Sequence, residues 1–232
     1  MRFDIENFRL DGKVAVVTGA GAGIGRAIAE LFASAGASVM VSDLDAGAAV
    51  AVSEAIGAAG GNAAATGCNV TEEADLVMLV NRAADEFGGV DVLVNNAGGG
   101  GPKPFDMPMS DFEWAYRLNV FAAFRLTQLC AAQMARRGGG AVLNISSMAG
   151  ENANSRMASY ASSKAAVNHL TRNIAFDLGP MGIRVNAIAP GAIKTHALST
   201  VLTPEIERHM LAKTPLARLG EPGDIAHAAL FL

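Results

Sequence analysis

A glycine-rich turn between two short apolar runs restricts the possible folds more than any other feature of the chain. Residues 14–17 form an apolar run of strand length, and the turn that follows has glycines at positions 19, 21, 23 and 25. Apolar residues at helical spacing come next, and a second strand-like run occupies residues 38–42. This order predicts two parallel strands that are joined by a helix.

The glycine turn and Asp43 together favour a dinucleotide site. Glycines let a backbone approach a pyrophosphate, and the start of the next helix offers free N–H groups. Asp43 follows Gly25 by 18 residues, just past the second strand. Its carboxylate can accept hydrogen bonds from adenosine ribose hydroxyls and would repel a 2′-phosphate, and Ala22 supplies no cation to offset that repulsion. The pattern favours NAD over NADP, and the alternative is a tight turn with a solvated aspartate.

Helical and strand-like segments alternate along the rest of the chain. We expect helices over residues 46–57, 74–87, 111–134 and from 159, and strands over 62–68, 90–94, 141–147 and 183–188. This alternation predicts an α/β fold in which residues 1–232 form a single domain around a Rossmann-like, doubly wound parallel sheet. The carboxyl ends of the strands then meet at one edge, which is where ligands bind in such sheets.

The C-terminal third has two further features. Residues 192–220 are irregular, apart from a short helix near 204–212, and we expect them to form a lid over a substrate. Residues 224–232 start a helix and end on apolar residues without a cap. We therefore expect the natural chain to continue, so that the last strand of the sheet is lacking here.

Tyr160 and Lys164 are the first candidates for chemistry, because a spacing of four residues places both side chains on one helix face. A free phenol has a pKa of about 10. One cation near 4 Å can stabilise the phenolate by about 4 kcal/mol at an effective dielectric of about 20, which brings that pKa toward 7. Alone, such a pair is more often a solvated helix face. Ser147 lies 13 residues before Tyr160 and competes with Ser146 as a hydroxyl donor.

Charge and composition exclude several classes of partner. The net charge is −4, and the longest basic run is the pair at residues 136–137, which argues against nucleic acid and anionic membranes. No apolar run approaches about 18 residues, so we expect no membrane span. Residues 1–6 mix charges and lack an apolar signal core. The two cysteines and four histidines lack metal-ligand spacing, so we expect no metal, and a cytoplasmic location is expected.

These motifs together resemble the short-chain dehydrogenase/reductase superfamily along the whole chain. The matching motifs are Thr18-Gly19-x-x-x-Gly23-Ile24-Gly25, Asn95-Asn96-Ala97-Gly98, Asn119, Ser147, Tyr160-x-x-x-Lys164 and Pro190-Gly191. The resemblance implies catalytic roles for Tyr160 as base, for Lys164 and Ser147 beside it, and for Asn119 as the holder of a proton-relaying water. It implies that Thr195 contacts the nicotinamide carboxamide.

The resemblance also implies a set of residues that contact the cofactor. They are Gly19, Gly23, Ile24, Gly25, Asp43, Asn69, Val70, Asn96, Ala97, Gly98, Tyr160, Lys164, Pro190, Gly191, Ile193 and Thr195. Asn69 departs from the aspartate that is common in the superfamily, which puts only the contact with adenine in doubt. For the substrate we expect contacts from Ser147, Tyr160 and Asn152, which follows the serine in the chain. His196 lies in the expected lid and is taken as structural.

Loop segments resemble those of bacterial hydroxysteroid dehydrogenases within the superfamily. They occupy residues 98–109, 159–166, 175–179, 188–193 and 203–207. This resemblance implies NAD-dependent oxidation of a secondary alcohol, the 7α-hydroxyl of a bile acid or steroid, by a homotetramer. Two alternatives are open: the same chemistry on a 3-oxoacyl thioester, sugar or small alcohol, and a non-catalytic NAD-binding protein. An extended sugar-nucleotide epimerase is disfavoured, because it has a different glycine spacing and a large C-terminal substrate domain.

Overall fold

Six strands that alternate with helices pair into one parallel sheet with the order β3-β2-β1-β4-β5-β6. The structure is a computed structural model that describes residues 8–200 and 202–232. Residues 1–7, where we expected no signal segment, lie outside the described residues, as does residue 201 of the expected lid. The strands are β1 (Val14–Thr18), β2 (Ser38–Asp43), β3 (Asn62–Gly67), β4 (Val92–Asn95), β5 (Gly140–Ile145) and β6 (Ile183–Ile188). The predicted fold class is confirmed.

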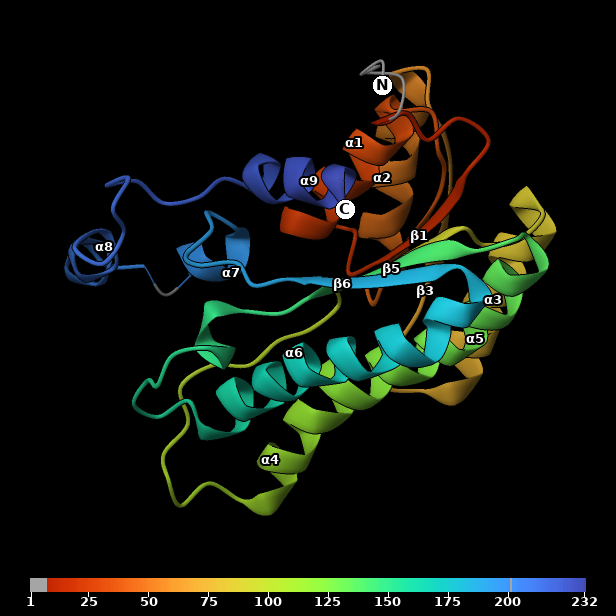
Figure 1. The fold of residues 1–232 in the computed structure, drawn as a ribbon. Helices are drawn as coiled ribbons and strands as arrows, with labels where there is room; N and C mark the ends of the chain where they lie inside the picture. The colour runs from red at the N-terminus through yellow and green to blue at the C-terminus, as the bar shows by residue number, and fades with distance from the viewer. Residues whose placement is uncertain (1–7, 201) are drawn as a thin grey trace, which may run out of the picture.

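Helices cover both faces of this sheet (Figure 1). One face carries α1 (Gly23–Ser34), α2 (Ala46–Ala58) and α9 (Pro222–Phe231), and the other carries α3 (Glu73–Phe87), α5 (Ala122–Arg136) and α6 (Ala158–Leu178). Side chains of β1 alternate between the two faces, so Ala15 and Val17 pack in one hydrophobic core and Val16 in the other. Burial on both faces explains why the central strand β1 is apolar except for its last residue, Thr18.

The site is positioned by the reversal of strand order at β1. β1 pairs with β2 on one side and with β4 on the other. After β1 the chain continues through β2 and β3 toward one edge of the sheet, and after β3 it returns to add β4, β5 and β6 toward the other edge. A crevice opens at such a point, outside the carboxyl ends of the strands. The strand ends Thr18, Asp43, Asn95 and Ile145 all lie at this edge. Asp43 is the last residue of β2, whereas the sequence predicted that it directly follows the strand.

The helical stretch predicted over residues 111–134 is present, and a π-helical turn in its middle changes the helix geometry. The segment consists of α4 (Met109–Tyr116), a π-helical turn (Arg117–Phe121) and α5. Asn119 lies in the wide turn, is 3% exposed and bonds to the backbone of Gly99. A π-turn inside a helix re-aims side chains and is frequent at functional sites. Asn119, which the resemblance singled out, therefore lies at a change of helix geometry.

Beyond β6 the chain leaves the sheet and carries two short helices, α7 (His196–Ser199) and α8 (Pro204–Leu211). Figure 1 shows both extending past the edge where the strands end. The sequence predicted α8 but not α7. Among the described residues, no helix combines the length and the apolar character that crossing a bilayer requires.

Candidate active site at the carboxyl edge of the sheet

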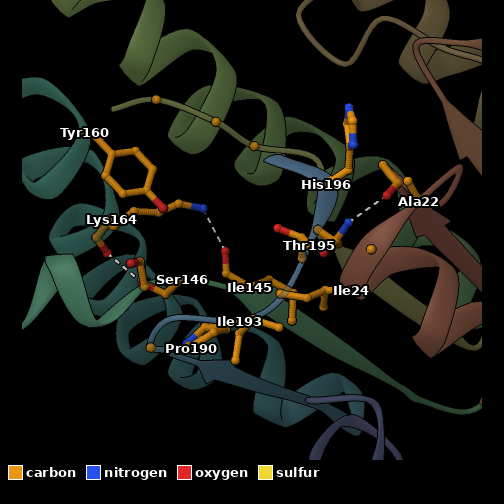
Figure 2. A pocket seen from close by; sticks show the side chains of 18 residues that line it. Ala22, Ile24, Ile145, Ser146, Tyr160, Lys164, Pro190, Ile193, Thr195 and His196 are labelled. Atoms are coloured by element: carbon orange, nitrogen blue, oxygen red, sulfur yellow. Dashed lines mark hydrogen bonds between the residues drawn. The ribbon is translucent and has the colours of Figure 1, made fainter. Parts of the chain in front are cut away.

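Two adjoining cavities of about 500 and 420 Å³ follow the carboxyl edge of the sheet. Gly19, Asn96 and Gly98 line both, so the cavities form one groove. All but one of the predicted cofactor residues line it, and the exception is Gly25. Of the other predicted residues, Ser147 lines the larger cavity, whereas Asn119 and Asn152 line neither. Figure 2 shows the side chains of the larger cavity.

The glycine turn adopts backbone angles and contacts that larger residues would disturb. Gly19 and Gly23 have φ values of +61° and +56°, in the left-handed region that favours glycine. A Cβ atom on Gly19 would lie 3.0 Å from the Cα atom of Ala97. Gly25 is buried against the carbonyl of Gly19, so its smallness serves the packing of helix on turn. The glycine turn therefore leaves no room for larger side chains and exposes the backbone at the start of α1.

Asp43 closes the far end of the groove. Its carboxylate accepts hydrogen bonds from the N–H groups of Gly21 at 2.8 Å and Asp45 at 3.0 Å. A carboxylate has about four acceptor positions, so it can still accept from ribose hydroxyls. Among the described residues that line this cavity, none is lysine or arginine. Both observations agree with the preference for NAD that the sequence predicts.

Asn95 and Asn96 bind the sheet rather than face a ligand with their amides. The Asn96 side chain donates to the carbonyls of Thr18 and Gly19, both at 2.9 Å. Asn95, which is buried, donates to Asn144 Oδ1 at 2.9 Å and so ties β4 to β5. The resemblance implies that Asn96, Ala97 and Gly98 contact the cofactor. The structure adds that the side-chain amides of Asn95 and Asn96 fix the backbone and strands beneath the groove.

Tyr160 and Lys164 lie on the same face of α6, as their spacing predicts. The Lys164 Nζ atom is 5.9 Å from the Tyr160 ring centroid and donates to the Ile145 carbonyl at 2.8 Å (Figure 2). Lys164 is 5% exposed, and burial lowers the pKa of its ammonium to about 8. At neutral pH the side chain is still mainly protonated. It therefore supplies a positive charge beside the phenol.

The two serines after β5 have different surroundings. The Ser146 hydroxyl is 4% exposed and donates to the Lys164 carbonyl at 3.1 Å. The Ser147 oxygen accepts from the N–H of Ala149 at 3.1 Å, and the residue is half-buried at the wall of the cavity. A hydroxyl has only one proton to donate. Ser146 has already used its proton, whereas Ser147 has not.

Asn119 reaches the site indirectly. Its Nδ2 atom donates to the Gly99 carbonyl at 2.9 Å and to Ser163 Oγ at 3.1 Å, and Ser163 donates to the Tyr160 carbonyl at 2.7 Å. The π-turn thus joins the loop after β4 to the helix that carries Tyr160. These contacts give Asn119 a positioning role, and its predicted role in holding a water stays a prediction.

The structure adds His196 to the groove. It begins α7 directly after Thr195, which caps that helix by accepting from the Leu198 N–H at 3.3 Å. Figure 2 places its imidazole beside Thr195, on the side of Ala22. His196 has no partner at metal-ligand spacing in the sequence, and its position in the structure depends on the fold of the segment after β6. Only its position within the expected lid pointed toward the site.

Comparisons with known proteins agree with this geometry. The short chain dehydrogenase family model matches residues 13–205. The chain is 61% identical to 7alpha-hydroxysteroid dehydrogenase of Escherichia coli K12 over 230 residues, which cover 99% of this chain and 90% of that protein. It is 39% identical to the 3-oxoacyl-[acyl-carrier-protein] reductase FabG of Vibrio cholerae over 225 residues, which cover 96% and 90%.

A solved structure also matches this chain in fold and in sequence. It is a 7 alpha-hydroxysteroid dehydrogenase complexed with NADH and 7-oxo glycochenodeoxycholic acid, and it is 61% identical to this chain. The match has a TM-score of 0.98 and covers 100% of this chain and 91% of that one. Sequence, fold and groove therefore agree that the chain belongs to the short-chain dehydrogenase family.

Proposed function

We propose that this chain is an NAD-dependent dehydrogenase that oxidises the 7α-hydroxyl group of a bile acid to a ketone. The observation that carries the proposal is the 61% identity to 7alpha-hydroxysteroid dehydrogenase over nearly the whole chain. The solved structure with NADH and a 7-oxo bile acid supports it, because that structure is the product complex of the same reaction. The non-catalytic alternative is disfavoured, since Ser147, Tyr160 and Lys164 all line one groove.

The groove fits NAD along its length. Asp43 would accept from the adenosine ribose, the backbone between Gly19 and Ile24 would face the pyrophosphate, and Lys164 would face the nicotinamide ribose. Val70 and Asn69 line the end expected for adenine. When NAD is bound, its nicotinamide ring accepts the hydride that leaves the substrate carbon.

The chain's own residues move and hold the proton. Tyr160 acts as the base toward the substrate hydroxyl, and the Lys164 ammonium lies beside its ring. Ser147 donates its free O–H to the substrate oxygen and orients it, as the groove geometry allows. Asn119 fixes the position of the Tyr160 helix through Ser163. A relay of the proton through a water at Asn119 remains part of the proposal.

A second candidate is the same chemistry on a 3-oxoacyl thioester. The 39% identity to a 3-oxoacyl-[acyl-carrier-protein] reductase favours it over a sugar or a small alcohol. Shared catalytic residues do not separate the two substrates, because substrate choice depends on loops around a common site. The bile acid is preferred since the identity to the hydroxysteroid enzyme is much higher.

A homotetramer in the cytoplasm completes the proposal. Large apolar side chains are exposed on four helical segments, namely Trp114, Phe121, Phe124 and Phe176, with exposed fractions of 51%, 60%, 40% and 86%. Apolar surface of this kind is typical of faces that pack between subunits. Light scattering after gel filtration tests the subunit number, and a monomer would contradict it. Cell fractionation tests the location, and recovery outside the cytoplasm would contradict it.

The proposed reaction is tested by NAD reduction with a substrate panel. It contains bile acids with hydroxyls at carbons 3, 7 or 12, several 3-hydroxyacyl thioesters and simple alcohols. We expect turnover with the 7α-hydroxy bile acids to exceed that with every other compound by at least tenfold in kcat/KM. A preference for the acyl thioesters would instead establish the second candidate.

A further inference from the structure

The segment between β6 and α9 leaves the sheet and returns to it (Figure 1), and we call the place where its two ends meet the neck. Ile193 and Gly220 form a parallel bridge at this neck. The N–H of Gly220 donates to the Ala192 carbonyl at 2.9 Å, and the N–H of Lys194 donates to the Gly220 carbonyl at 2.8 Å. The first residues of the expected lid, 192–194, are thus hydrogen-bonded to its last residue, Gly220.

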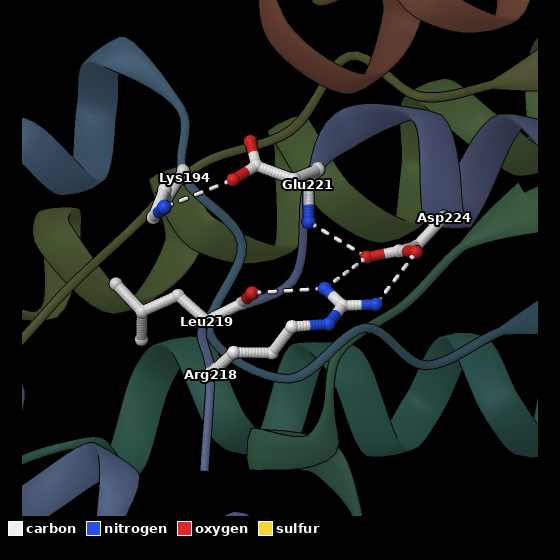
Figure 3. A network of polar contacts seen from close by, with 5 residues as sticks. All are labelled: Lys194, Arg218, Leu219, Glu221 and Asp224. Atoms are coloured by element: carbon white, nitrogen blue, oxygen red, sulfur yellow. Dashed lines mark hydrogen bonds and ion pairs between the residues drawn. The ribbon is translucent and has the colours of Figure 1, made fainter. Parts of the chain in front are cut away.

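Figure 3 shows two ion pairs at the neck: one joins Lys194 to Glu221 across it, and the other, between Arg218 and Asp224, lies within its returning side. Lys194 Nζ lies 2.9 Å from Glu221 Oε1, and the Arg218 guanidinium binds both carboxylate oxygens of Asp224 at 2.7 and 3.0 Å. Asp224 also accepts from the N–H of Glu221 at 2.8 Å, in the first turn of α9. The Arg218 hydrogen bond, more than the other contacts, lowers the pKa of Asp224 to about 2. We call Lys194, Arg218, Glu221 and Asp224 the neck clamp.

The neck holds two side chains of the cofactor groove. Ile193 is 8% exposed, lines the larger cavity and forms the bridge itself. A Cβ atom on Gly220 would overlap the Cδ1 atom of Ile193, so the strand beside it has no room for a side chain. Thr195 lines the same cavity and faces the glycine turn, where a Cβ atom on Gly23 would lie 3.2 Å from Thr195 Cγ2.

The acidic and arginine members of the clamp are outside the groove. Arg218, Glu221 and Asp224 line neither of its two cavities, and their side chains are roughly half exposed. Exposed pairs add little to global stability, about 0–1 kcal/mol each. A bidentate arginine–carboxylate pair nevertheless fixes geometry well, because its two hydrogen bonds are parallel. The clamp is thus better suited to hold a local arrangement than to stabilise the whole fold.

We propose that Arg218, Glu221 and Asp224 are positioning residues for the cofactor, which hold Ile193 and Thr195 in place whatever the lid between them does. The proposal rests on the proposed function only in taking NAD or NADH as the ligand of the groove. A fixed neck lets the lid respond to a substrate while the cofactor wall stays constant. Cofactor affinity would then depend on a clamp that does not touch the cofactor.

The first test is a fluorescence titration of NADH into the full chain. For Arg218→Met we expect the Kd for NADH to rise about tenfold, and for Arg218→Lys a smaller rise, since lysine keeps the charge but not the two-point contact. The matched control is Lys213→Met, which removes an exposed cation of the same segment that takes no part in the clamp. This control should bind NADH like the parent chain.

A second variant removes no charge. Gly220→Ala would push the Ile193 side chain toward the groove, and we expect a similar loss of NADH affinity with both ion pairs intact. Circular dichroism at the titration temperature shows that each variant is folded. Wild-type affinity in both Arg218→Met and Gly220→Ala would overturn the proposal, as would an equal loss in Lys213→Met.

The titration contains no alcohol substrate, so it is independent of the proposed reaction. A wild-type chain that binds NADH but oxidises no bile acid would refute the proposed function and leave the clamp to be judged by the variants. A wild-type chain that does not bind NADH would refute both. In steady state, the clamp predicts that Arg218→Met raises the KM for NAD more than it lowers kcat.

Discussion

Lys164 is a buried ammonium whose strongest contact is one backbone carbonyl. Its Nζ atom donates to the Ile145 carbonyl at 2.8 Å, and burial lowers its pKa from 10.5 to about 8. The fold therefore disfavours the charge that the chemistry needs. Such a conflict between stability and function is typical of active sites, where groups are kept in environments that perturb their pKa values.

This conflict predicts a pH-dependent stability. In the unfolded chain the lysine has an ordinary pKa of about 10.4, so its charge opposes folding fully below pH 8 and this opposition disappears as the pH rises toward 10.5. Relative to Lys164→Met, the wild-type chain should gain free energy of unfolding between those pH values, on the order of 3 kcal/mol. Urea unfolding without cofactor measures the difference. Lys213→Met, an exposed control, should show no such trend, and a flat or falling difference for Lys164→Met would contradict the burial argument.

The two serines give a second residue-scale prediction. Ser147→Ala should lower kcat/KM about 100-fold, because it removes the donor to the reacting oxygen. Ser146→Ala should change kcat/KM only a few-fold and lower the free energy of unfolding by about 1 kcal/mol, since it removes a buried hydrogen bond. Steady-state kinetics and urea unfolding of both variants measure this. Equal losses of activity would show that the assignment of Ser147 is wrong.

At the scale of elements, Asp91 and Arg137 join the end of α5 to the starts of two strands, at the edge of the sheet opposite the site. Asp91, which is 5% exposed, accepts from the Val14 N–H at 2.8 Å and from Arg137 at 2.9 and 2.8 Å. Burial raises the pKa of Asp91, but the Arg137 and Val14 hydrogen bonds and the nearby positive charges outweigh it, so the pKa is lowered. The end of α5 is thereby held against the starts of β1 and β4.

Breaking this pair should destabilise the fold measurably. Arg137→Met should lower the free energy of unfolding at pH 7 by about 2 kcal/mol, because it leaves a buried carboxylate without its cation. The loss should shrink below about pH 4, as Asp91 takes up a proton and no longer needs a partner. Urea unfolding measures it, and Arg136→Met on the same helix is the exposed control. If the two variants were equally stable, the pair would have no structural role.

Elements differ in how far the sequence predicts them. Strands and α6 follow from apolar runs and helical spacing, which are local properties. The π-turn at Asn119 does not follow in this way, because it depends on contacts with Gly99 and Ser163, which are distant in sequence. The neck clamp could not be predicted for the same reason, since Lys194 and Glu221 meet only once the segment between them has folded back.

For the whole molecule, the predicted edge of the sheet is where the groove lies. The glycine turn, Asp43 and Ser147 each follow or end a predicted strand, and parallel strands end on one side of the sheet, so the sequence places these residues at this edge. Residue types alone could not place His196 in the groove or separate Ser146 from Ser147, which needed the path of the chain after β5 and β6. The expected role of Asn152 as a substrate contact stays a prediction.

The central claim is that Tyr160 removes a proton from a 7α-hydroxyl group while NAD takes up the hydride. The most direct test is NAD reduction with the 7α- and 7β-hydroxy epimers of one bile acid, by the wild-type chain and by Tyr160→Phe. The account predicts rapid NADH formation from the 7α epimer only, loss of turnover by at least about 1,000-fold in Tyr160→Phe, and unchanged NADH binding in that variant. Equal oxidation of the two epimers, or substantial turnover without the phenol, would contradict it.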